Sequence, residues 1–223
     1  MKLVIFDCDG TLVDSQHLIV EAMNTAFRAN GVEALPREQV LSIVGLSLPL
    51  AIETLMPGEP PYMIAAVTDG YRDAFSVLRQ DPANHEPLYD GIREVVETLS
   101  QRDDVVLGVA TGKSIRGVDR LLNHMDWVKH FATIQTADTH PSKPNPSMIE
   151  TAMREAGTGP RDTIMIGDTT FDMRMALNAG VSALGVSWGY HPVADLQAEG
   201  AHDIAHHAAD IIPLAEQLLL KAQ

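Results

Sequence analysis

The sequence predicts an α/β protein: a doubly wound parallel sheet with a helical domain inserted after the first strand. Three observations lead to this fold class. Short apolar runs without internal alternation recur along the chain, and such runs are typical of strands buried on both faces. Longer amphipathic segments lie between these runs, as in repeated strand–helix units. One stretch near the N-terminus, residues 14–86, has helical patterns only.

Each predicted strand corresponds to one apolar run. The runs lie at residues 3–6, 105–110, 131–135, 163–167 and 182–186. Amphipathic patterns predict the helices between them, at residues 91–101, 114–124, 146–156, 171–179 and 209–221. Strands that alternate with helices in this way form a parallel, Rossmann-like sheet with helices on both faces.

Residues 14–86, which we call the helical insert, break this alternation. Helical patterns occur at residues 16–29, 37–43, 47–55 and 61–79, and prolines separate them. A turn-rich segment, DPANHEPLYDG, then leads back to the strand–helix pattern. We therefore expect residues 1–13 and 87–223 to form the α/β core domain, with residues 14–86 as a separate helical domain.

Three predicted strands are followed directly by, or end in, a polar residue: Asp7, Thr111 and Asp168. In open α/β sheets, ligands bind at the carboxyl ends of the strands, so these residues should converge on one crevice. The two aspartates belong to acidic clusters, DCDGTLVDS and GDTTFD. Clustered carboxylates are hard to bury without a cation, and ligand sets made only of oxygen suit Mg²⁺. The sequence therefore predicts a Mg²⁺ site.

The same crevice should hold Lys143, which lies in the proline-stiffened string HPSKPNPS. Carboxylates, a metal ion, an ammonium and a hydroxyl together suit an anionic substrate with several oxygens, and phosphate fits this description. Gly10 and Gly112 would let the backbone approach such a substrate closely.

Four motifs of this sequence resemble those of a known protein family. DxDGTxxDS at a strand end, a later Thr after an apolar strand, a Lys-Pro loop and GDxxxD resemble the motifs of the haloacid dehalogenase superfamily, in that family's order and across the whole chain. The helical insert is similar to the superfamily's first-type cap domain. DGTLVDS, followed by this insert and then by YDGIREVVETL, resembles the phosphoglycolate-phosphatase-like branch most closely.

This resemblance implies a role for each motif. Asp7 would be the nucleophile that forms an aspartyl-phosphate, and Asp9 the general acid and base. Mg²⁺ would be held by the side chains of Asp7 and Asp168 and by the backbone carbonyl of Asp9. Thr111 and Lys143 would hold the transferring phosphoryl group.

Asp172 lies about one helical turn after Asp168 and has a less definite role. It would ligate the metal through water or orient Lys143. The alternative is a purely structural one, because a carboxylate near a helix N-terminus is stabilised by the helix dipole. Two further residues, Asp14 and Ser15, are expected to cap the first helix of the insert.

Substrate selection is expected from the insert, which would close over the crevice. The candidates to face the leaving group are His17, the turn Gly45-Leu46-Ser47, and Arg72. Arg72 would bind a second anionic group of the substrate, or would pair with Asp69 or Asp73 on a surface helix.

The expected activity is Mg²⁺-dependent hydrolysis of a small phosphorylated metabolite, either phosphoglycolate-like or a sugar phosphate. One alternative is a phosphosugar mutase of the β-phosphoglucomutase type, but Thr11 follows Gly10 as in the phosphatases that the chain resembles. The other alternative, a catalytically silent binding module, is disfavoured by the intact motifs.

Composition narrows the classes of partner. The chain of 223 residues has 16 Lys and Arg against 30 Asp and Glu, a formal net charge of −14. This charge disfavours nucleic acids and anionic membranes as partners, and no apolar run approaches the roughly 20 residues that span a bilayer. The single cysteine, Cys8, is expected to be buried and suits a cytoplasmic protein. A monomer and a homodimer are both compatible with this surface.

Overall fold

A computed structural model describes residues 1–81 and 83–221 of the chain. Its centre is a six-stranded sheet in the order β3-β2-β1-β4-β5-β6, in which every neighbouring pair is parallel. The strands are β1 (Lys2–Phe6), β2 (Val105–Thr111), β3 (Phe131–Thr136), β4 (Thr163–Gly167), β5 (Ser182–Val186) and β6 (Asp203–Ala205). The predicted α/β fold class is therefore confirmed.

The register of the central strands brings the predicted site residues to one edge of the sheet. Phe6, the last residue of β1, pairs with Val109 of β2 and with Ile166 of β4. The segments that follow these residues consequently leave the sheet side by side, as expected for the carboxyl ends of parallel strands.

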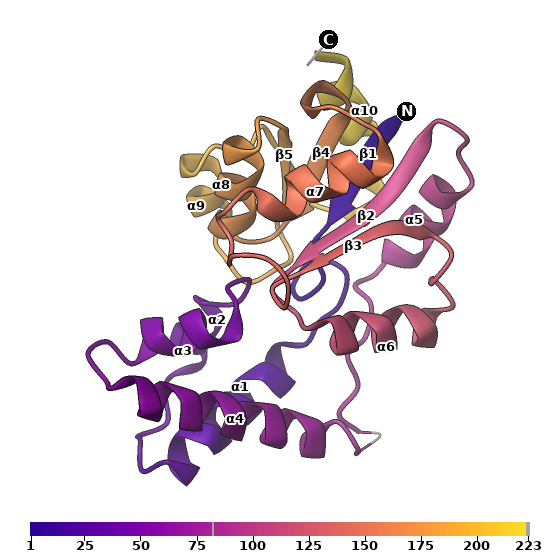
Figure 1. Cartoon of the computed structure of the whole chain (residues 1–223). Helices are drawn as coiled ribbons and strands as arrows, with labels where there is room; N and C mark the ends of the chain where they lie inside the picture. The colour runs from indigo at the N-terminus through magenta and orange to yellow at the C-terminus, as the bar shows by residue number, and fades with distance from the viewer. Residues whose placement is uncertain (82, 222–223) are drawn as a thin grey trace.

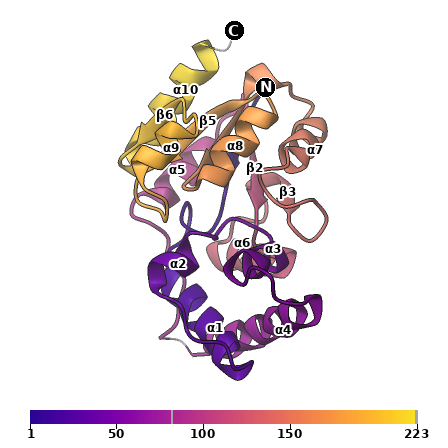
Figure 2. The ribbon, with the colours of Figure 1, turned by 90° about the vertical axis from the view of Figure 1, so that its left-hand side faces the viewer.

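Helices cover both faces of the sheet (Figure 2). They are α5 (Ile92–Ser100), α6 (Ile115–Met125), α7 (Ser147–Ala156), α8 (Thr170–Asn178), α9 (Val193–Ala198) and α10 (Ile211–Lys221). One apolar cluster joins the sheet to α5, α6 and α10, and a second cluster joins it to α7, α8 and α9. Cys8 is buried in the first cluster, as expected for a packing residue.

The helical insert lies beyond the carboxyl ends of the strands (Figure 1). It contains α1 (Gln16–Ala29), α2 (Arg37–Leu41), α3 (Leu48–Leu55) and α4 (Pro61–Leu78). These helices bury a third apolar cluster, whose fully buried members, including Phe27, Ile52 and Val67, all come from the insert itself. The four helices thus have a core of their own beside the edge where the site residues meet.

One helix is missing from the sequence prediction. The helix α9 has six residues and Leu196 is its one buried side chain, so it carries no repeating apolar pattern that would mark it as a helix. The structure also contains two short 3₁₀ turns, Pro160–Asp162 and Ala208–Asp210. Among the residues that the structure describes, no helix is both long and apolar enough to cross a membrane.

Candidate active site

Asp7 directly follows β1 and is almost completely buried, with 1% of its surface exposed. The Nζ atom of Lys143 lies 3.1 Å from its Oδ1 atom, yet no described group donates a well-aligned hydrogen bond to either carboxylate oxygen. Burial raises the pKa of Asp7 to about 6, against the opposing effect of the Lys143 ammonium, and the Asp172 carboxylate adds to the rise. Asp7 is therefore a buried carboxylate that pairs with one ammonium but accepts no well-aligned hydrogen bond, an arrangement that is costly unless a ligand contacts it.

Asp168 follows β4 and lies beside Asp7. One carboxylate oxygen each from Asp7, Asp168 and Asp172 falls within 4.8 Å of the others. The Thr11 hydroxyl donates to Asp168 Oδ1 at 2.8 Å, and the backbone N–H of Tyr190 donates to Oδ2 at 2.9 Å. Burial, followed by repulsion from Asp172 and Asp7, raises the pKa of Asp168 well above its usual range.

Lys143 is fully buried and donates a hydrogen bond of 2.6 Å to Asp172 Oδ1. The other oxygen of Asp172 accepts hydrogen bonds from the backbone N–H and the hydroxyl of Thr169. The backbone N–H of Asp172 donates to the Thr169 hydroxyl oxygen in return, which completes a capping box at the start of α8. Asp172 thus contacts Lys143 and also stabilises the helix N-terminus. Burial lowers the pKa of Lys143, but the Asp172 and Asp7 carboxylates outweigh it and raise the pKa above the ordinary value.

This cluster fits a divalent cation. Its three buried carboxylates face one buried ammonium, so two negative charges remain uncompensated. The donors are all oxygen, which suits Mg²⁺. Gly10, with φ of +85°, permits the close approach of the turn, because a Cβ atom at this position would lie 2.1 Å from Asp168 Oδ2.

Asp9 lies in the turn after β1, and its Oδ1 atom accepts two hydrogen bonds. Ser15 Oγ donates at 2.6 Å and Lys113 Nζ at 2.7 Å, and Lys113 also donates to Glu86 Oε1 at 2.7 Å. Ser15 occupies the expected N-cap position of α1, but its hydroxyl makes no capping hydrogen bond there and contacts Asp9 instead. Sequence reasoning missed Lys113 and Glu86, although Lys113 follows Thr111 by two residues at a strand end.

Thr111 ends β2 and is buried. Its hydroxyl is among the groups that oppose the rise in the pKa of Asp7, and it accepts a 3.2 Å hydrogen bond from the backbone N–H of Lys113. The following helix is capped by Ser114 and not by Thr111. Thr111 is therefore placed beside the nucleophile candidate and has no helix-capping role.

The four residues of the insert that were expected to select the substrate lie at two kinds of position. A Cβ atom at Gly45 would lie 3.2 Å from Thr169 Oγ1, and the backbone N–H of Ser47 donates to Ser142 Oγ at 2.8 Å, so this turn rests on the core. His17 is exposed at the start of α1. Arg72 pairs with Asp69 at 2.9 Å on the exposed face of α4, and no described contact links it to the buried carboxylates.

The segment after β5 is the other part of the site that sequence reasoning missed. Tyr190 donates its backbone N–H to Asp168, and its hydroxyl accepts from the backbone N–H of Ser15 at 3.1 Å. The indole N–H of Trp188 donates to the carbonyl of Thr11 at 3.2 Å. The sequence could have indicated that this segment contributes to the site, because SWGYHP follows a buried strand at the same edge of the sheet.

Comparisons with known proteins agree with this geometry. Residues 4–186 match the family model of the haloacid dehalogenase-like hydrolases. The chain is 35% identical to a protein of Dickeya dadantii named probable phosphatase IndB, across 97% of this chain and 94% of that protein. It is 30% identical to a phosphoglycolate phosphatase of Agrobacterium fabrum, across 98% and 94% of the two chains.

The fold has a similar counterpart among solved structures. The crystal structure of a predicted phosphatase from Clostridium acetobutylicum superposes with a TM-score of 0.84 and 25% sequence identity, and the alignment covers 98% of each chain. The α/β sheet and the helical insert therefore occur together in that protein, in the same arrangement.

Proposed function

The chain belongs to the haloacid dehalogenase-like hydrolase family, and we propose that it is a Mg²⁺-dependent phosphatase. It would hydrolyse a small phosphorylated metabolite through an aspartyl-phosphate on Asp7. A single observation carries this proposal: Asp7 is buried with no well-aligned hydrogen bond to either carboxylate oxygen, beside the Lys143 ammonium and two further carboxylates. A cytoplasmic location, expected from the sequence, is part of the same proposal.

Asp7 would act as the nucleophile. One carboxylate oxygen attacks phosphorus, and a bond from phosphorus to the leaving oxygen breaks as the Asp7–phosphate bond forms. Lys143 and Thr111 would hold the other phosphoryl oxygens, since both lie beside Asp7 and both can donate a hydrogen bond. The backbone at Gly10 and Gly112 would approach the same group.

Asp9 would act as the general acid and then as the general base. It gives a proton to the departing oxygen in the first step, and takes one from the water that attacks the aspartyl-phosphate in the second. Ser15 and Lys113 hold Oδ1 in place, and no hydrogen bond from a described residue reaches Oδ2. This arrangement supports the role, because one oxygen is fixed while the other stays available to exchange a proton.

The residues that would hold Mg²⁺ are Asp7 and Asp168 through their side chains and Asp9 through its backbone carbonyl. When bound, the metal ion supplies positive charge that neutralises the phosphate and lowers the repulsion between the carboxylates. Asp172 would not need to contact the ion, since it already orients Lys143 and caps α8.

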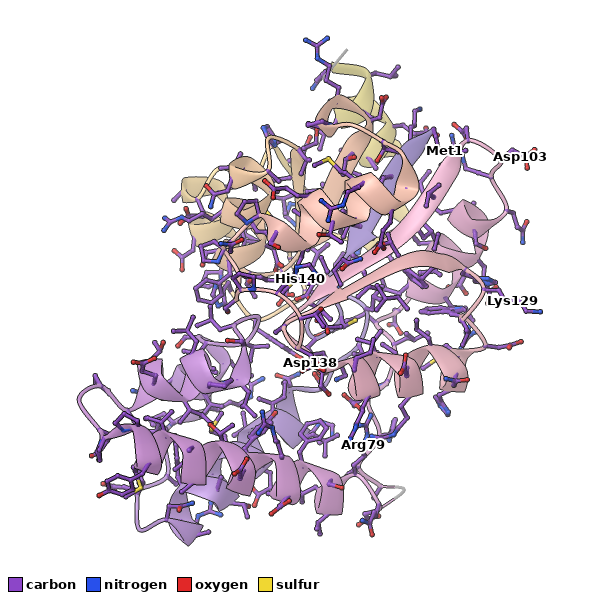
Figure 3. All side chains as sticks on the ribbon, viewed as in Figure 1. Met1, Arg79, Asp103, Lys129, Asp138 and His140 are labelled. Carbon is purple, nitrogen blue, oxygen red and sulfur yellow. The ribbon has the colours of Figure 1, made fainter. Side chains whose placement is uncertain are left out.

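Phosphate release from a panel of phosphorylated metabolites, with Mg²⁺ or with EDTA, tests the proposal. Asp7→Asn should lower the turnover number by about a thousandfold or more, because the amide is not a nucleophile, while circular dichroism stays unchanged. Asp103→Asn is the matched control: Asp103 lies exposed at the far end of the sheet (Figure 3) and should retain full activity. Metal-independent release, or substantial release by Asp7→Asn, would contradict the mechanism.

A further inference from the structure

Four charged side chains form a continuous chain between the helical insert and Asp9. Arg79 Nη2 donates to Glu86 Oε2 at 2.6 Å, Lys113 Nζ donates to Glu86 Oε1 at 2.7 Å, and Lys113 Nζ also donates to Asp9 Oδ1 at 2.7 Å. We call Asp9, Glu86, Arg79 and Lys113 the junction group. Their side chains are only 9–17% exposed, so water screens these charges weakly.

One side of α4 lies against the junction group, to which the C-cap residue of this helix, Arg79, belongs. Tyr71, Phe75 and Arg79 are spaced four residues apart, so they share one side of the helix. The Phe75 ring centroid lies 5.8 Å from Lys113 Nζ and 5.5 Å from Arg79 Cζ. Figure 3 shows Arg79 between the end of α4 and the α/β layer. Arg72, one residue after Tyr71, points elsewhere and pairs with Asp69 on the exposed face.

The junction group lies where a leaving group would be placed. Asp9 is the residue that protonates the leaving oxygen under the proposed function, and Lys113 and Glu86 are one and two hydrogen bonds from its carboxylate. Tyr71 lies next to the same charges, because its ring centroid is 5.7 Å from that of Phe75, which in turn lies 5.8 Å from Lys113 Nζ. The part of the substrate beyond the phosphate would therefore meet these residues.

The charges of the junction group cancel. Two carboxylates, Asp9 and Glu86, neutralise two cations, Lys113 and Arg79, and each cation has its partner within hydrogen-bond distance. A second anionic group on the substrate would find no unpaired cation among these residues. It would compete with Glu86 for these two cations and would lie close to the Glu86 carboxylate at a mostly buried site, where repulsion between like charges is unfavourable. A hydroxyl, by contrast, can donate to a Glu86 oxygen without separating the ion pairs.

We propose that Glu86 is a specificity-determining residue, which selects phosphomonoesters with an uncharged, hydroxyl-bearing leaving group and disfavours those that carry a second anionic group. This inference rests on the proposed phosphatase function. It reaches beyond that function because it names the chemical class of the leaving group and assigns its selection to a residue outside the four sequence motifs.

Matched pairs of substrates test the preference in the unmodified protein. The first pair is 2-hydroxyethyl phosphate and 2-phosphoglycolate, and the second is glycerol 3-phosphate and 3-phosphoglycerate. In each pair a hydroxymethyl group replaces a carboxylate. We expect kcat/KM to favour the uncharged member by about tenfold or more, which corresponds to the loss of one ion-pair partner. Equal rates, or faster hydrolysis of the carboxylate esters, would overturn the proposal.

Glu86→Gln tests the assigned residue, because the amide keeps the shape and removes the charge. It leaves Lys113 and Arg79 with an uncompensated positive charge, and we expect the preference to shift toward the carboxylate esters by about tenfold. Asp69→Asn is the matched control, since it also removes a carboxylate of the insert that pairs with an arginine, but from the exposed face of α4, where Asp69 is 73% exposed. An unchanged ratio in Glu86→Gln, or an equal shift in Asp69→Asn, would contradict the role of Glu86.

Calorimetric binding of phosphonates gives a readout independent of turnover. The probes are 3-hydroxypropylphosphonate and 2-carboxyethylphosphonate, and Glu86→Gln should bind the second more tightly relative to the first. If no ester, including p-nitrophenyl phosphate, releases phosphate, the proposed function fails, whereas release with an unaltered ratio rejects only the specificity proposal. If Glu86→Gln does not fold, the ratios measured on the unmodified protein still decide whether the preference exists.

Discussion

At the scale of single residues, Asp168 combines a functional position with a cost in stability. It is fully buried, and its carboxylate lies close to those of Asp7 and Asp172. Burial and repulsion raise its pKa well above the usual range, so the folded state of the metal-free protein binds a proton more tightly than the unfolded chain does. Above that pKa, ionised Asp168 therefore lowers the free energy of unfolding.

Replacement of Asp168 by Asn should accordingly stabilise the protein in EDTA, by about 1 kcal/mol or more, because the repulsion and the desolvated charge both disappear. The amide can keep both hydrogen bonds: its oxygen accepts from the Tyr190 N–H, and its NH₂ group donates to the Thr11 hydroxyl. Urea unfolding with EDTA and with Mg²⁺ measures the effect.

Mg²⁺ should raise the urea midpoint of the unmodified protein and leave that of Asp168→Asn unchanged, because the variant lacks one charged ligand. Asp103→Asn serves again as the control and should respond to Mg²⁺ like the unmodified chain. A variant that is less stable than the unmodified protein in EDTA would show that the two hydrogen bonds of Asp168, and not the repulsion, dominate its energetics.

At the scale of elements, a close contact between two backbone segments positions the insert on the core. Gly112 follows β2, and a Cβ atom there would lie 2.7 Å from the carbonyl oxygens of both Gly45 and Leu46. Backbone atoms cannot move aside as a flexible side chain can. The turn at residues 45–47 consequently rests directly on the segment that joins Thr111 to Lys113, two residues that line the proposed site.

Gly112→Ala should therefore push the insert turn away from the core without unfolding either part. We expect kcat/KM for phosphate release to fall by at least about tenfold, because displacements near 1 Å at a site of this kind have costs of that order. Gly159→Ala is the matched control, since nothing lies within 4 Å of a Cβ atom there. Equal activity of both variants, with unchanged circular dichroism, would show that this contact is not needed for catalysis.

The elements themselves could be predicted well from the sequence, because they depend on local patterns. Apolar runs marked the five longer strands of the sheet, and the four insert helices agree with their predicted ranges to within about two residues. The helix α9 was missed because Leu196 is its one buried side chain and no repeating apolar pattern marks it. For Arg72 the sequence left two interpretations open, and the structure shows the ion pair with Asp69 on the surface of α4. The pattern alone could not decide between them, since one position along a helix turns a side chain by about 100°.

The site was predictable where its residues follow strand ends. Asp7, Thr111 and Asp168 come together because parallel strands align their carboxyl ends, which the sequence pattern implies. Glu86 and Tyr190 were not predictable in this way. Glu86 reaches Lys113 from the segment that leads back from the insert, and Tyr190 reaches Asp168 from beyond β5, so both contacts depend on the tertiary packing of loops.

At the scale of the whole molecule, the chain consists of the sheet with its covering helices and of the helical insert, and two adjacent segments join these parts. The backbone N–H of Asp14 donates to the carbonyl of Pro87 at 2.8 Å, and that of Tyr89 donates to Leu12 at 3.1 Å. The outgoing and returning connections therefore lie side by side. The third apolar cluster, buried within the insert, shares none of its fully buried members with the two clusters on the sheet.

This organisation predicts that the insert can open locally while the sheet stays folded. Phe27 is completely buried in the cluster of the insert, and Phe27→Ala should destabilise that cluster by about 3–5 kcal/mol. Native-state hydrogen exchange should then accelerate in α1–α4, whereas amides of β1, β2 and β4 should keep the protection they have in the unmodified protein. Phe6→Ala, at an equally buried position in β1, should instead accelerate exchange throughout the molecule. If Phe27→Ala accelerated exchange equally in the strands and in the insert, the chain would unfold as one cooperative unit. The insert could then not open while the sheet stays folded, and local opening would not explain how the insert moves over the site.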